Sequence, residues 1–254
     1  MPMRSEGGHE ANGLTAVILA GGLGTRIRHL LGELPKPMMP VAGRPFLEWV
    51  VRYFAKQGIS RFVLATGYRG EAIEKHFAQR PVGGVEIVCA RESEPLGTAG
   101  AFLNAVKLSG LVSENWLVAN GDSLVLTTEF GRLCTAASEG TSLGVILGLE
   151  VEDAGRFGSL QVTPEGVLKR FAEKRPGAGL INAGVYAFRQ QLLDMLPRTR
   201  PLSFETEVFP ALLAEGHSLR VISSHGPFLD IGTEESLSQA EDFIRDHQDW
   251  FQRQ

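Results

Sequence analysis

The sequence of 254 residues has few cysteines, no long apolar run and no excess of positive charge. Its two cysteines, Cys89 and Cys134, are too few for a disulfide framework, and neither has the closely spaced partner that a metal site needs. No apolar run approaches the ~18 residues that a membrane-spanning helix requires. Lys and Arg number 25 against 29 Asp and Glu, so the net charge is −4, and no basic block indicates a nucleic-acid surface. We therefore expect neither a membrane nor a nucleic acid as the main partner.

Targeting and metal-binding patterns are also missing. The first 13 residues carry no apolar segment of the kind that a secretory signal peptide has. We predict that residues 1–13 form a disordered tail, that residues 14–254 form a single domain, and that the protein is cytoplasmic. Apolar stretches surround both cysteines, which predicts buried and reduced thiols. The six histidines show no paired spacing, so we do not expect a transition-metal site.

The sequence is rich in glycine. It has 30 glycines in 254 residues, which exceeds the usual share of ~7%. Such an excess indicates tight turns, or backbone that approaches a ligand closely. Apolar residues make up 43%, as in ordinary globular proteins, and the chain is long enough to bury a sizeable core.

Strand-like and helix-like patterns alternate through the first 140 residues. Apolar runs predict strands at residues 14–20, 62–66, 85–90 and 116–120. Apolar residues at helical spacing predict helices at residues 45–57, 71–77, 99–108 and 130–137. Alternation of this kind is typical of βαβ units around a mostly parallel sheet. We therefore predict an α/β protein with a Rossmann-like, three-layer fold.

The rhythm changes in the second half. Strand-like segments follow one another with only turns between most of them, at residues 142–151, 159–162, 167–171 and 184–188. Helices return at residues 210–215 and 233–251. Thr233 is a suitable cap for the last helix, and two glutamates follow it at the positive end of the helix dipole. These features predict a mixed extension of the parallel sheet.

A glycine-rich loop directly follows the first strand, in the segment AGGLGTRIRHLLGELPKPM (residues 20–38). Gly21, Gly22 and Gly24 let backbone N–H groups turn towards an anion. The segment lacks the GK[ST] ending of a Walker A loop, and Ile27 stands where the dinucleotide fingerprint needs its third glycine. For the glycines alone, an ordinary tight turn remains the alternative.

Two cations in this segment favour anion binding. Arg26 adds a permanent positive charge next to the glycines. Lys36 lies between Pro35 and Pro37, which stiffen the backbone and fix the direction of the lysine. A lysine on a solvated surface has no need of two flanking prolines, so we interpret Lys36 as a ligand-binding residue.

Two aspartates end apolar strand-like segments far apart in the chain. Asp122 follows WLVAN and a glycine, and Asp230 lies in FLDIG. Ligands gather at the carboxyl ends of strands in open α/β sheets, and Mg²⁺ takes one or two carboxylates and completes its shell with phosphate and water. The two aspartates therefore predict a magnesium site. A turn or a helix cap is the alternative for either residue alone.

The motifs in this order resemble those of the sugar-1-phosphate nucleotidyltransferases, also called NDP-sugar pyrophosphorylases. The N-terminal signature of that family, GGxGTR…PKP, is present at residues 21–26 and 35–37. The other matching motifs are EPLGTAG (94–100), NGD (120–122), EK (173–174), NAG (182–184) and FLDIG (228–232). The resemblance runs from residue 14 to about residue 237 and implies the nucleotide-diphospho-sugar transferase type of fold.

The resemblance also implies a reaction and roles for individual residues. A nucleoside triphosphate and a sugar 1-phosphate would condense to an NDP-sugar and pyrophosphate, with catalytic roles for Arg26, Lys36 and Lys174 and Mg²⁺ on Asp122 and Asp230. Nucleotide-binding roles fall on Ala20, Gly21, Gly22, Gly24, Thr25, Glu92, Gly97, Thr98 and Gly121. Sugar-binding roles fall on Asn120, Gly158, Glu173 and Asn182.

Some of these residues have alternative readings. An exposed charged turn is the alternative for Glu173 and Lys174. Asn182 lies in the otherwise apolar segment LINAGVY, where an amide that donates and accepts hydrogen bonds suits a hydroxyl ligand.

Glu92 predicts the choice of base. It lies five positions before Gly97. The resemblance implies that the backbone at Gly97 contacts the base of the nucleotide. A carboxylate can accept two parallel hydrogen bonds from guanine, whereas uracil and thymine offer one donor flanked by carbonyls. Glu92 is therefore our hypothesis for a guanine reader, and an acid that faces solvent is the alternative.

Within the family, the motifs look most like those of the D-glycero-D-manno-heptose 1-phosphate guanylyltransferases. The matching segments are PKPM…PFLE (35–48), GLINAGVY (179–186), SFE (203–205) and FLDIG (228–232). Transferases for mannose, glucose or N-acetylmuramic acid 1-phosphate remain alternatives, as does a non-catalytic regulatory homologue. A glycosyltransferase is disfavoured, because Ser123 and Leu124 follow Asp122 where an Asp-x-Asp motif is needed. The sequence leaves a homodimer open.

Overall fold

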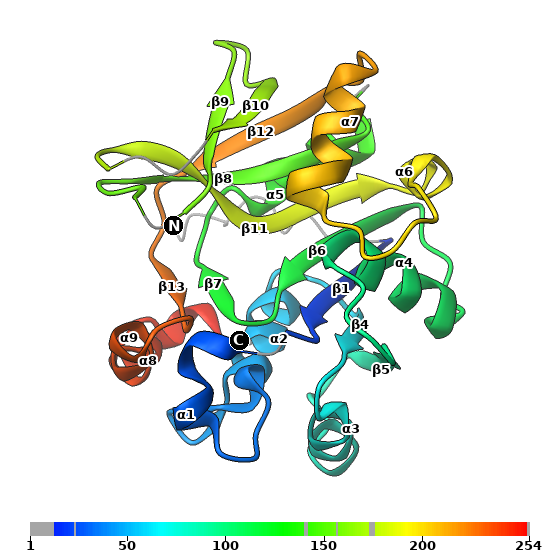
Figure 1. Cartoon of the computed structure of the whole chain (residues 1–254). Coiled ribbons are helices and arrows are strands. Elements are labelled where there is room, and N and C mark those ends of the chain that lie inside the picture. Colours follow the sequence, from blue (N-terminus) through cyan, green and yellow to red (C-terminus); the bar gives the residue numbers. More distant parts are fainter. Residues whose placement is uncertain (1–12, 23, 140–141, 156, 173–175, 253–254) are drawn as a thin grey trace, which may run out of the picture.

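A computed structural model describes residues 13–22, 24–139, 142–155, 157–172 and 176–252. At its centre is a mixed sheet of nine strands, with helices packed against it (Figure 1). Apart from Gly13, the predicted N-terminal tail lies outside the described residues.

Four strands of the sheet run parallel and form its N-terminal half. They are β1 (Leu14–Ala20), β4 (Arg61–Thr66), β5 (Glu86–Arg91) and β6 (Asn115–Asn120), in the spatial order β6-β1-β4-β5. Successive side chains of β1 point to opposite faces of the sheet and belong to two different apolar clusters. Ile18 belongs to one cluster and Val17 to the other. Because both faces of β1 are covered, its sequence is continuously apolar rather than alternating.

Five further strands extend the sheet beyond β6. They are β8 (Gly144–Val151), β9 (Ser159–Val162), β10 (Leu168–Ala172), β11 (Gly179–Arg189) and β12 (Leu219–Ser224). β11 pairs antiparallel with β6, β8 and β9, β10 pairs antiparallel with β9, and β12 pairs parallel with β8. Only β10 and β11 of this sheet therefore run against the other described strands. The predicted mixed but mostly parallel sheet is confirmed, whereas β12 was not predicted.

Helices cover both faces of the sheet, and each set belongs to a different apolar cluster. On one face lie α2 (Phe46–Lys56), α3 (Gly70–Gln79), α5 (Phe130–Glu139) and α9 (Ala240–Asp246). On the other lie α4 (Thr98–Ser109), α6 (Gln191–Met195) and α7 (Phe209–Ala214). The predicted three layers are confirmed. Within the described residues, no helix has both the length and the apolar character needed to cross a membrane.

The C-terminal helix differs from the prediction of one helix over residues 233–251. The segment forms α8 (Glu234–Ser238), α9 and the 3-10 turn η4 (Gln248–Trp250). Thr233 caps α8 as predicted, in a capping box with Ser236. Ser238 Oγ donates to the carbonyl of Glu235 at 2.6 Å. Serine bonds of this kind compete with the helical hydrogen bonds and bend or end helices.

The remaining described elements are short. They are η1 (Thr25–Ile27), α1 (Arg28–Leu31), η2 (Lys36–Met38), β2 (Pro40–Val41), β3 (Arg44–Pro45), β7 (Ser123–Val125), β13 (Phe228–Asp230) and η3 (Phe204–Val208). β7 and β13 form a separate antiparallel pair in which Asp230 lies opposite Ser123. This pair brings the end of the chain back to the carboxyl end of β6.

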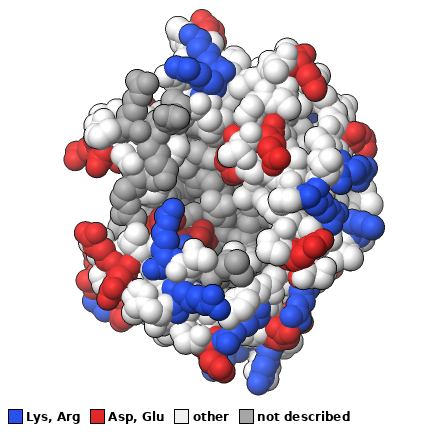
Figure 2. All heavy atoms as spheres, viewed as in Figure 1, with Lys and Arg blue, Asp and Glu red and all other residues white. Residues whose placement is uncertain are grey.

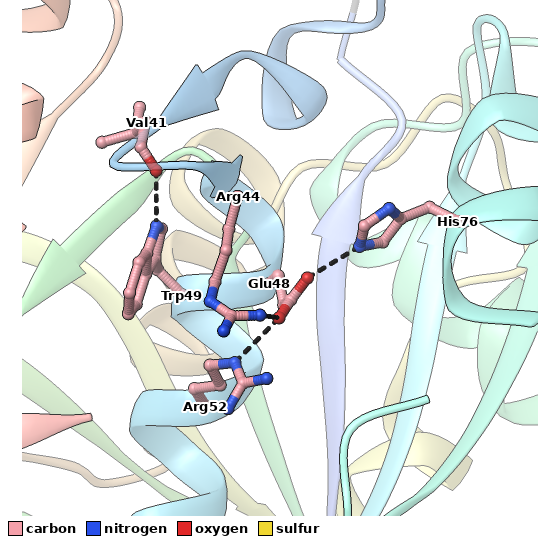
Figure 3. Close-up of polar contacts among 6 residues, drawn as sticks. All are labelled: Val41, Arg44, Glu48, Trp49, Arg52 and His76. Atoms are coloured by element: carbon pink, nitrogen blue, oxygen red, sulfur yellow. Dashed lines mark hydrogen bonds and ion pairs between the residues drawn. The ribbon is translucent and has the colours of Figure 1, made fainter. Parts of the chain in front are cut away.

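A buried carboxylate anchors α2. Glu48 is 2% exposed, and its Oε1 accepts hydrogen bonds from Arg44 at 2.6 Å and Arg52 at 2.8 Å (Figure 3). Its Oε2 lies 2.8 Å from His76 Nε2 on α3. Burial by itself raises the pKa of Glu48, but the hydrogen bonds from Arg52, His76 and Arg44 outweigh it, so the pKa lies below its usual value. Glu48 therefore ties α2 to β3 and α3.

The two cysteines are free and half-buried. Burial raises the pKa of Cys89 to about 11 and that of Cys134 to about 12. Both thiols therefore stay protonated near neutral pH. The cysteines were predicted to be buried and reduced; they are free, but only half-buried.

Candidate functional site

A cleft of about 560 Å³ opens at the carboxyl ends of β1 and β6. The chain passes from β1 to β4 and β5 on one side and then returns through α4 to β6 on the other side of β1. The direction of winding therefore changes between β1 and β6, and ligands in open α/β sheets bind at such a switch point. Figure 2 shows a hollow on the face seen in Figure 1, with charged side chains of both signs beside it.

The loop after β1 forms one wall of the cleft, through Gly21, Gly22, Gly24, Thr25 and Arg26. Gly24 has a φ of 57°, and a Cβ there would lie 2.9 Å from Leu31 Cδ1 and 3.0 Å from Lys36 Cβ. Only glycine suits both this backbone conformation and this close approach. Gly24 thus allows the loop to pack against Lys36, while the exposed Arg26 adds a positive charge to the same wall.

Two of the predicted nucleotide-binding residues lie behind this wall rather than on it. Ala20 ends β1 and is 1% exposed. Gly121 is buried, and its backbone N–H donates to the carbonyl of Leu19 at 2.9 Å. Ala20 and Gly121 therefore support the residues that follow them, the glycine loop and Asp122, and do not line the described cleft.

Lys36 and Asp122 form an ion pair on the cleft wall. Lys36 begins η2, between Pro35 and Pro37, and its Nζ donates to Asp122 Oδ2 at 2.7 Å. The Lys36 side chain is 11% exposed and that of Asp122 is 35% exposed. Because the lysine is largely shielded from water, its positive charge attracts Asp122, and any phosphate that enters, more strongly than a solvated charge would.

Asp230 lies beside this pair. β13 places it opposite Ser123, and the N–H of Ile231 donates to the carbonyl of Asp122 at 3.0 Å. Asp230 Oδ1 accepts from the N–H of Gly232 at 2.8 Å. A Cβ on Gly232 would collide with this oxygen and would lie 3.4 Å from Lys36 Nζ. Two carboxylates from distant parts of the chain therefore lie around one ammonium.

The donor set of the cleft fits a hard cation that brings its own additional ligands. Asp122 and Asp230 offer carboxylate oxygens, which Mg²⁺ prefers. Among the described residues, no group of three or more His, Cys, Asp or Glu could hold a metal without help. An ion at this place would take its remaining ligands from phosphate and water, as Mg²⁺ commonly does.

The predicted nucleotide-binding residues Glu92, Gly97 and Thr98 also line the cleft. Glu92 is half-buried, and a Cβ on Gly21 would lie 2.6 Å from its Oε1. Burial raises the pKa of Glu92, and a hydrogen bond from the N–H of Leu96 at 3.4 Å opposes the rise. The carboxylate therefore lies against the glycine loop and takes part in the cleft wall, while its role as a guanine reader stays a prediction.

The predicted sugar-binding residues lie in different surroundings. Asn120 lines the cleft, but Gly158 and Asn182 do not. The N–H of Asn182 donates to the carbonyl of Gly158 at 3.1 Å, so these two residues are neighbours in β11 and the loop before β9. Glu173 and Lys174 lie outside the described residues.

A hydrogen-bonded network beside the cleft was missed in the sequence. Glu205 accepts hydrogen bonds from Tyr186 Oη, Thr98 Oγ1 and Ser203 Oγ. The segment SFE offered a signal, because serine is a preferred N-cap residue and acids are favourable in the first turn of a helix. Nothing in the sequence, however, connects Glu205 with Tyr186 or Thr98, which are distant in the chain.

The chain is similar to known nucleotidyl transferases. Residues 15–247 match that family as a whole. Over 232 residues the chain is 34% identical to a mannose-1-phosphate guanylyltransferase of Mycobacterium tuberculosis, covering 91% of this chain and 62% of the relative. A catalytic subunit beta of mannose-1-phosphate guanylyltransferase from Drosophila melanogaster is also 34% identical. The chain thus spans less than two thirds of these relatives.

A second group of relatives has nearly the same length as the chain. A D-glycero-alpha-D-manno-heptose 1-phosphate guanylyltransferase of Aneurinibacillus thermoaerophilus is 33% identical over 229 residues, covering 90% of this chain and 97% of the relative. Among solved structures, HddC from Yersinia pseudotuberculosis, described as complexed with GMP-PN, superposes with a TM-score of 0.79 at 31% identity. That match covers 91% of this chain and 99% of HddC.

Proposed function

Since the chain belongs to the nucleotidyl transferase family, we propose that it joins GTP to a sugar 1-phosphate, D-glycero-α-D-manno-heptose 1-phosphate, and releases pyrophosphate. The observation that carries this proposal is that Arg26, Lys36, Asp122 and Asp230 line one cleft at the switch point of the sheet. In this proposal residues 14–254 act as one domain in the cytoplasm.

The reaction needs charge neutralisation more than covalent chemistry. An oxygen of the sugar phosphate forms a bond to the α-phosphorus of the triphosphate, and the bond from that phosphorus to the bridging oxygen breaks, so that pyrophosphate leaves with the electron pair. The phosphates repel one another, and enzymes of this kind act mainly by positioning and electrostatic stabilisation. Arg26 and Lys36 offset the negative charge from the glycine loop side, and Lys174 is proposed to act on the sugar phosphate.

Asp122 and Asp230 would hold a Mg²⁺ ion. When bound, the ion would neutralise phosphate charge and orient the triphosphate. Lys36 keeps the Asp122 carboxylate in place by its hydrogen bond of 2.7 Å. Gly232 holds Asp230 through its backbone N–H.

The choice of GTP follows from Glu92. Its carboxylate lies in the cleft wall next to Gly21, and Gly97 lines the same cleft. A carboxylate there accepts the two parallel N–H donors of guanine and faces the carbonyls of uracil or thymine unfavourably. Relatives that act on mannose and on heptose phosphates both carry the name guanylyltransferase, which supports the same choice.

The choice of a heptose phosphate has its own support. The heptose-named relative is covered over 97% of its length, whereas the mannose-named relative from Mycobacterium tuberculosis is covered over 62%. Asn120, Gly158, Glu173 and Asn182 are the residues that we propose for the sugar. Mannose 1-phosphate is the second candidate, because relatives with that activity are equally similar in sequence.

Release of pyrophosphate from purified protein tests the proposal. GTP, dTTP and UTP would each be combined with heptose, mannose and glucose 1-phosphates in the presence of Mg²⁺. We expect the highest kcat/KM for GTP with the heptose phosphate. A preference for mannose 1-phosphate would show that mannose 1-phosphate, not the heptose phosphate, is the acceptor. A preference for dTTP or UTP would contradict the role of Glu92 as a guanine reader. Absence of pyrophosphate release with every pair of substrates would favour the non-catalytic alternative.

A further inference from the structure

Glu205 joins the cleft wall at Thr98 to strand β11, which comes from a distant segment of the chain. Its Oε2 accepts hydrogen bonds from Thr98 Oγ1 at 2.9 Å and Ser203 Oγ at 2.8 Å. Its Oε1 accepts from Tyr186 Oη at 2.8 Å. Tyr186 Oη in turn accepts from Asn182 Nδ2 at 2.7 Å. One carboxylate thus connects Thr98 on the cleft wall with Asn182 in strand β11.

The direction of these hydrogen bonds is determined by the ionisation of Tyr186. Its ring is fully buried, and burial raises the pKa of the phenol well above its usual value, with the charge of Glu205 adding to the rise. The phenol therefore keeps its proton and donates it to Glu205. Its oxygen is left to accept from the amide of Asn182, which fixes the rotamer of that amide.

The segment that carries Ser203 and Glu205 also holds the backbone of the loop around Gly97, before α4. Gly97 has a φ of 74°, and a Cβ there would lie 2.5 Å from the carbonyl oxygen of Leu202. That oxygen accepts hydrogen bonds from Ala99 at 2.9 Å and Gly100 at 3.0 Å, and the N–H of Leu202 donates to Leu96 at 2.8 Å. The start of α4 is therefore attached to the segment that ends in Ser203 and Glu205.

We propose that Glu205 is a positioning residue that holds the nucleotide loop through Thr98 and the acceptor strand through Tyr186 and Asn182, so that the two substrates are aligned by one carboxylate. This inference rests on the proposed function, because it assigns the nucleotide to the loop of Thr98 and the sugar to the strand of Asn182. Glu205 itself touches neither substrate in this proposal.

The first test is the isosteric change Glu205→Gln. The amide would turn a donor towards the hydroxyls of Thr98 and Ser203, which now donate to Oε2. We expect KM to rise for both GTP and the sugar phosphate by about tenfold, the scale of a lost hydrogen bond to a charged group. The matched control is Glu207→Gln, which removes an equal charge from the same short helix. Glu207 is exposed and accepts from the backbone N–H of Ser203, so both KM values should stay within about twofold.

A second pair of variants separates the two arms of the network. Tyr186→Phe removes the hydroxyl between Glu205 and Asn182, and we expect it to raise KM for the sugar phosphate more than KM for GTP. Thr98→Val removes the hydroxyl that bonds to Glu205 on the nucleotide side, and we expect the reverse ratio. Glu205→Gln should combine both effects, which a role limited to folding would not produce.

Thermal unfolding and wild-type activity complete the experiment. If Glu205→Gln lowers Tm but leaves both KM values at the wild-type level, Glu205 stabilises the fold only and the inference is wrong. If Glu205→Gln does not fold, the ratio of the two KM values in Tyr186→Phe decides, and equal changes would overturn the inference. An inactive wild-type protein would instead contradict the proposed function, so the two failures are distinguishable.

Discussion

At the scale of single residues, the cleft contains cations of two kinds. Lys36 is 11% exposed and directs its ammonium at Asp122, whereas Arg26 is exposed at the mouth of the glycine loop. The shielded charge of Lys36 interacts mainly with its one partner at short range. The exposed charge of Arg26 is screened more by solvent, but it is free to attract a ligand that enters the cleft. Arg26 is therefore the better test of whether a phosphate chain binds here.

We expect Arg26→Ala to lower kcat by about 10²-fold, because one preorganised charge on a transferring phosphate carries a few kcal/mol. Pyrophosphate release under saturating substrates measures the effect. Arg28→Ala is the matched control, since Arg28 is exposed on the same segment and is not among the cleft-lining residues. Near-normal turnover of Arg26→Ala, or an equal loss in Arg28→Ala, would mean that the charge is misassigned.

Glu92→Gln should remove the preference for GTP over dTTP and UTP, because an amide cannot accept both donors of guanine. The ratio of the kcat/KM values for the three triphosphates measures it. Glu94→Gln serves as the control, since Glu94 is an exposed acid of the same loop that does not line the cleft. An unchanged ratio in Glu92→Gln would remove this residue from base selection.

The ionisation of Glu92 adds a dependence on pH. Burial raises its pKa above the usual value of 4.5, and guanine reading needs the charged carboxylate. Protonation therefore begins at a higher pH than for an ordinary glutamate, and KM for GTP should rise as pH falls through that region. KM measured across pH 4.5 to 8 would show the rise in the wild type and a flatter profile in Glu92→Gln. The same slope in both proteins would assign the titration to another group.

At the scale of elements, the position of α2 is fixed by a buried charge as well as by its apolar face. Glu48 bonds to Arg44 and Arg52 and lies against His76 (Figure 3). A carboxylate with its partners in place is stable inside the protein, but removing one member leaves an uncompensated charge. The segment before α2 carries Lys36, so the anchor of α2 also supports the cleft.

Glu48→Ala should lower the free energy of unfolding by about 3 kcal/mol, since it leaves the two arginines without their shared partner. Because the folded-state pKa of Glu48 is lowered, its contribution is present above the usual value of 4.5 and is lost as pH falls through the folded-state pKa. Urea unfolding would be measured at pH 7 and at decreasing pH. The free energy of unfolding should fall on acidification in the wild type, and it should fall less in Glu48→Ala. Glu71→Ala, an exposed acid paired with Arg91, should behave like the wild type; an equal loss there would contradict the assignment.

Elements differ in how well their sequences predict them. The strands β1, β4, β5 and β6 are apolar and lie between helices, so each was predicted within one or two residues. β7 and β13 have three residues each, which is too short for any alternation to appear. Their pairing depends on contacts between distant segments, and no local pattern encodes such contacts.

At the scale of the whole molecule, the site forms because the last part of the chain returns to the first sheet. β13 places Asp230 next to the strand that follows Asp122, and Lys36, at the start of η2, bonds to Asp122 and lies near Gly232 beside Asp230. Each side chain alone permits an ordinary structural explanation, such as a turn or a cap. Their joint position in one cleft is what supports a function.

We expect Asp122→Asn to weaken the binding of divalent metal in the presence of GTP by about tenfold or more, the scale on which ligand-shell changes act. Titration with Mn²⁺, followed through the signal of the free ion, measures the affinity directly. Asp194→Asn on α6 is the control, because Asp194 is exposed and lies outside the cleft lining. A loss of thermal stability that matches the loss of activity, with unchanged metal affinity, would show a structural role instead.

The sequence by itself determined the class of fold, the order of most strands and helices, and the residue types gathered at the strand ends. These follow from local rules, because apolar periodicity, glycine conformations and proline restraints act over a few neighbouring residues. Only the tertiary structure decided that Ala20 and Gly121 lie behind the cleft wall, that Asn182 bonds to Tyr186, and that Glu205 joins Tyr186 to Thr98. Such contacts depend on the packing of segments far apart in the chain, and that packing is a property of the whole sheet and its two layers of helices.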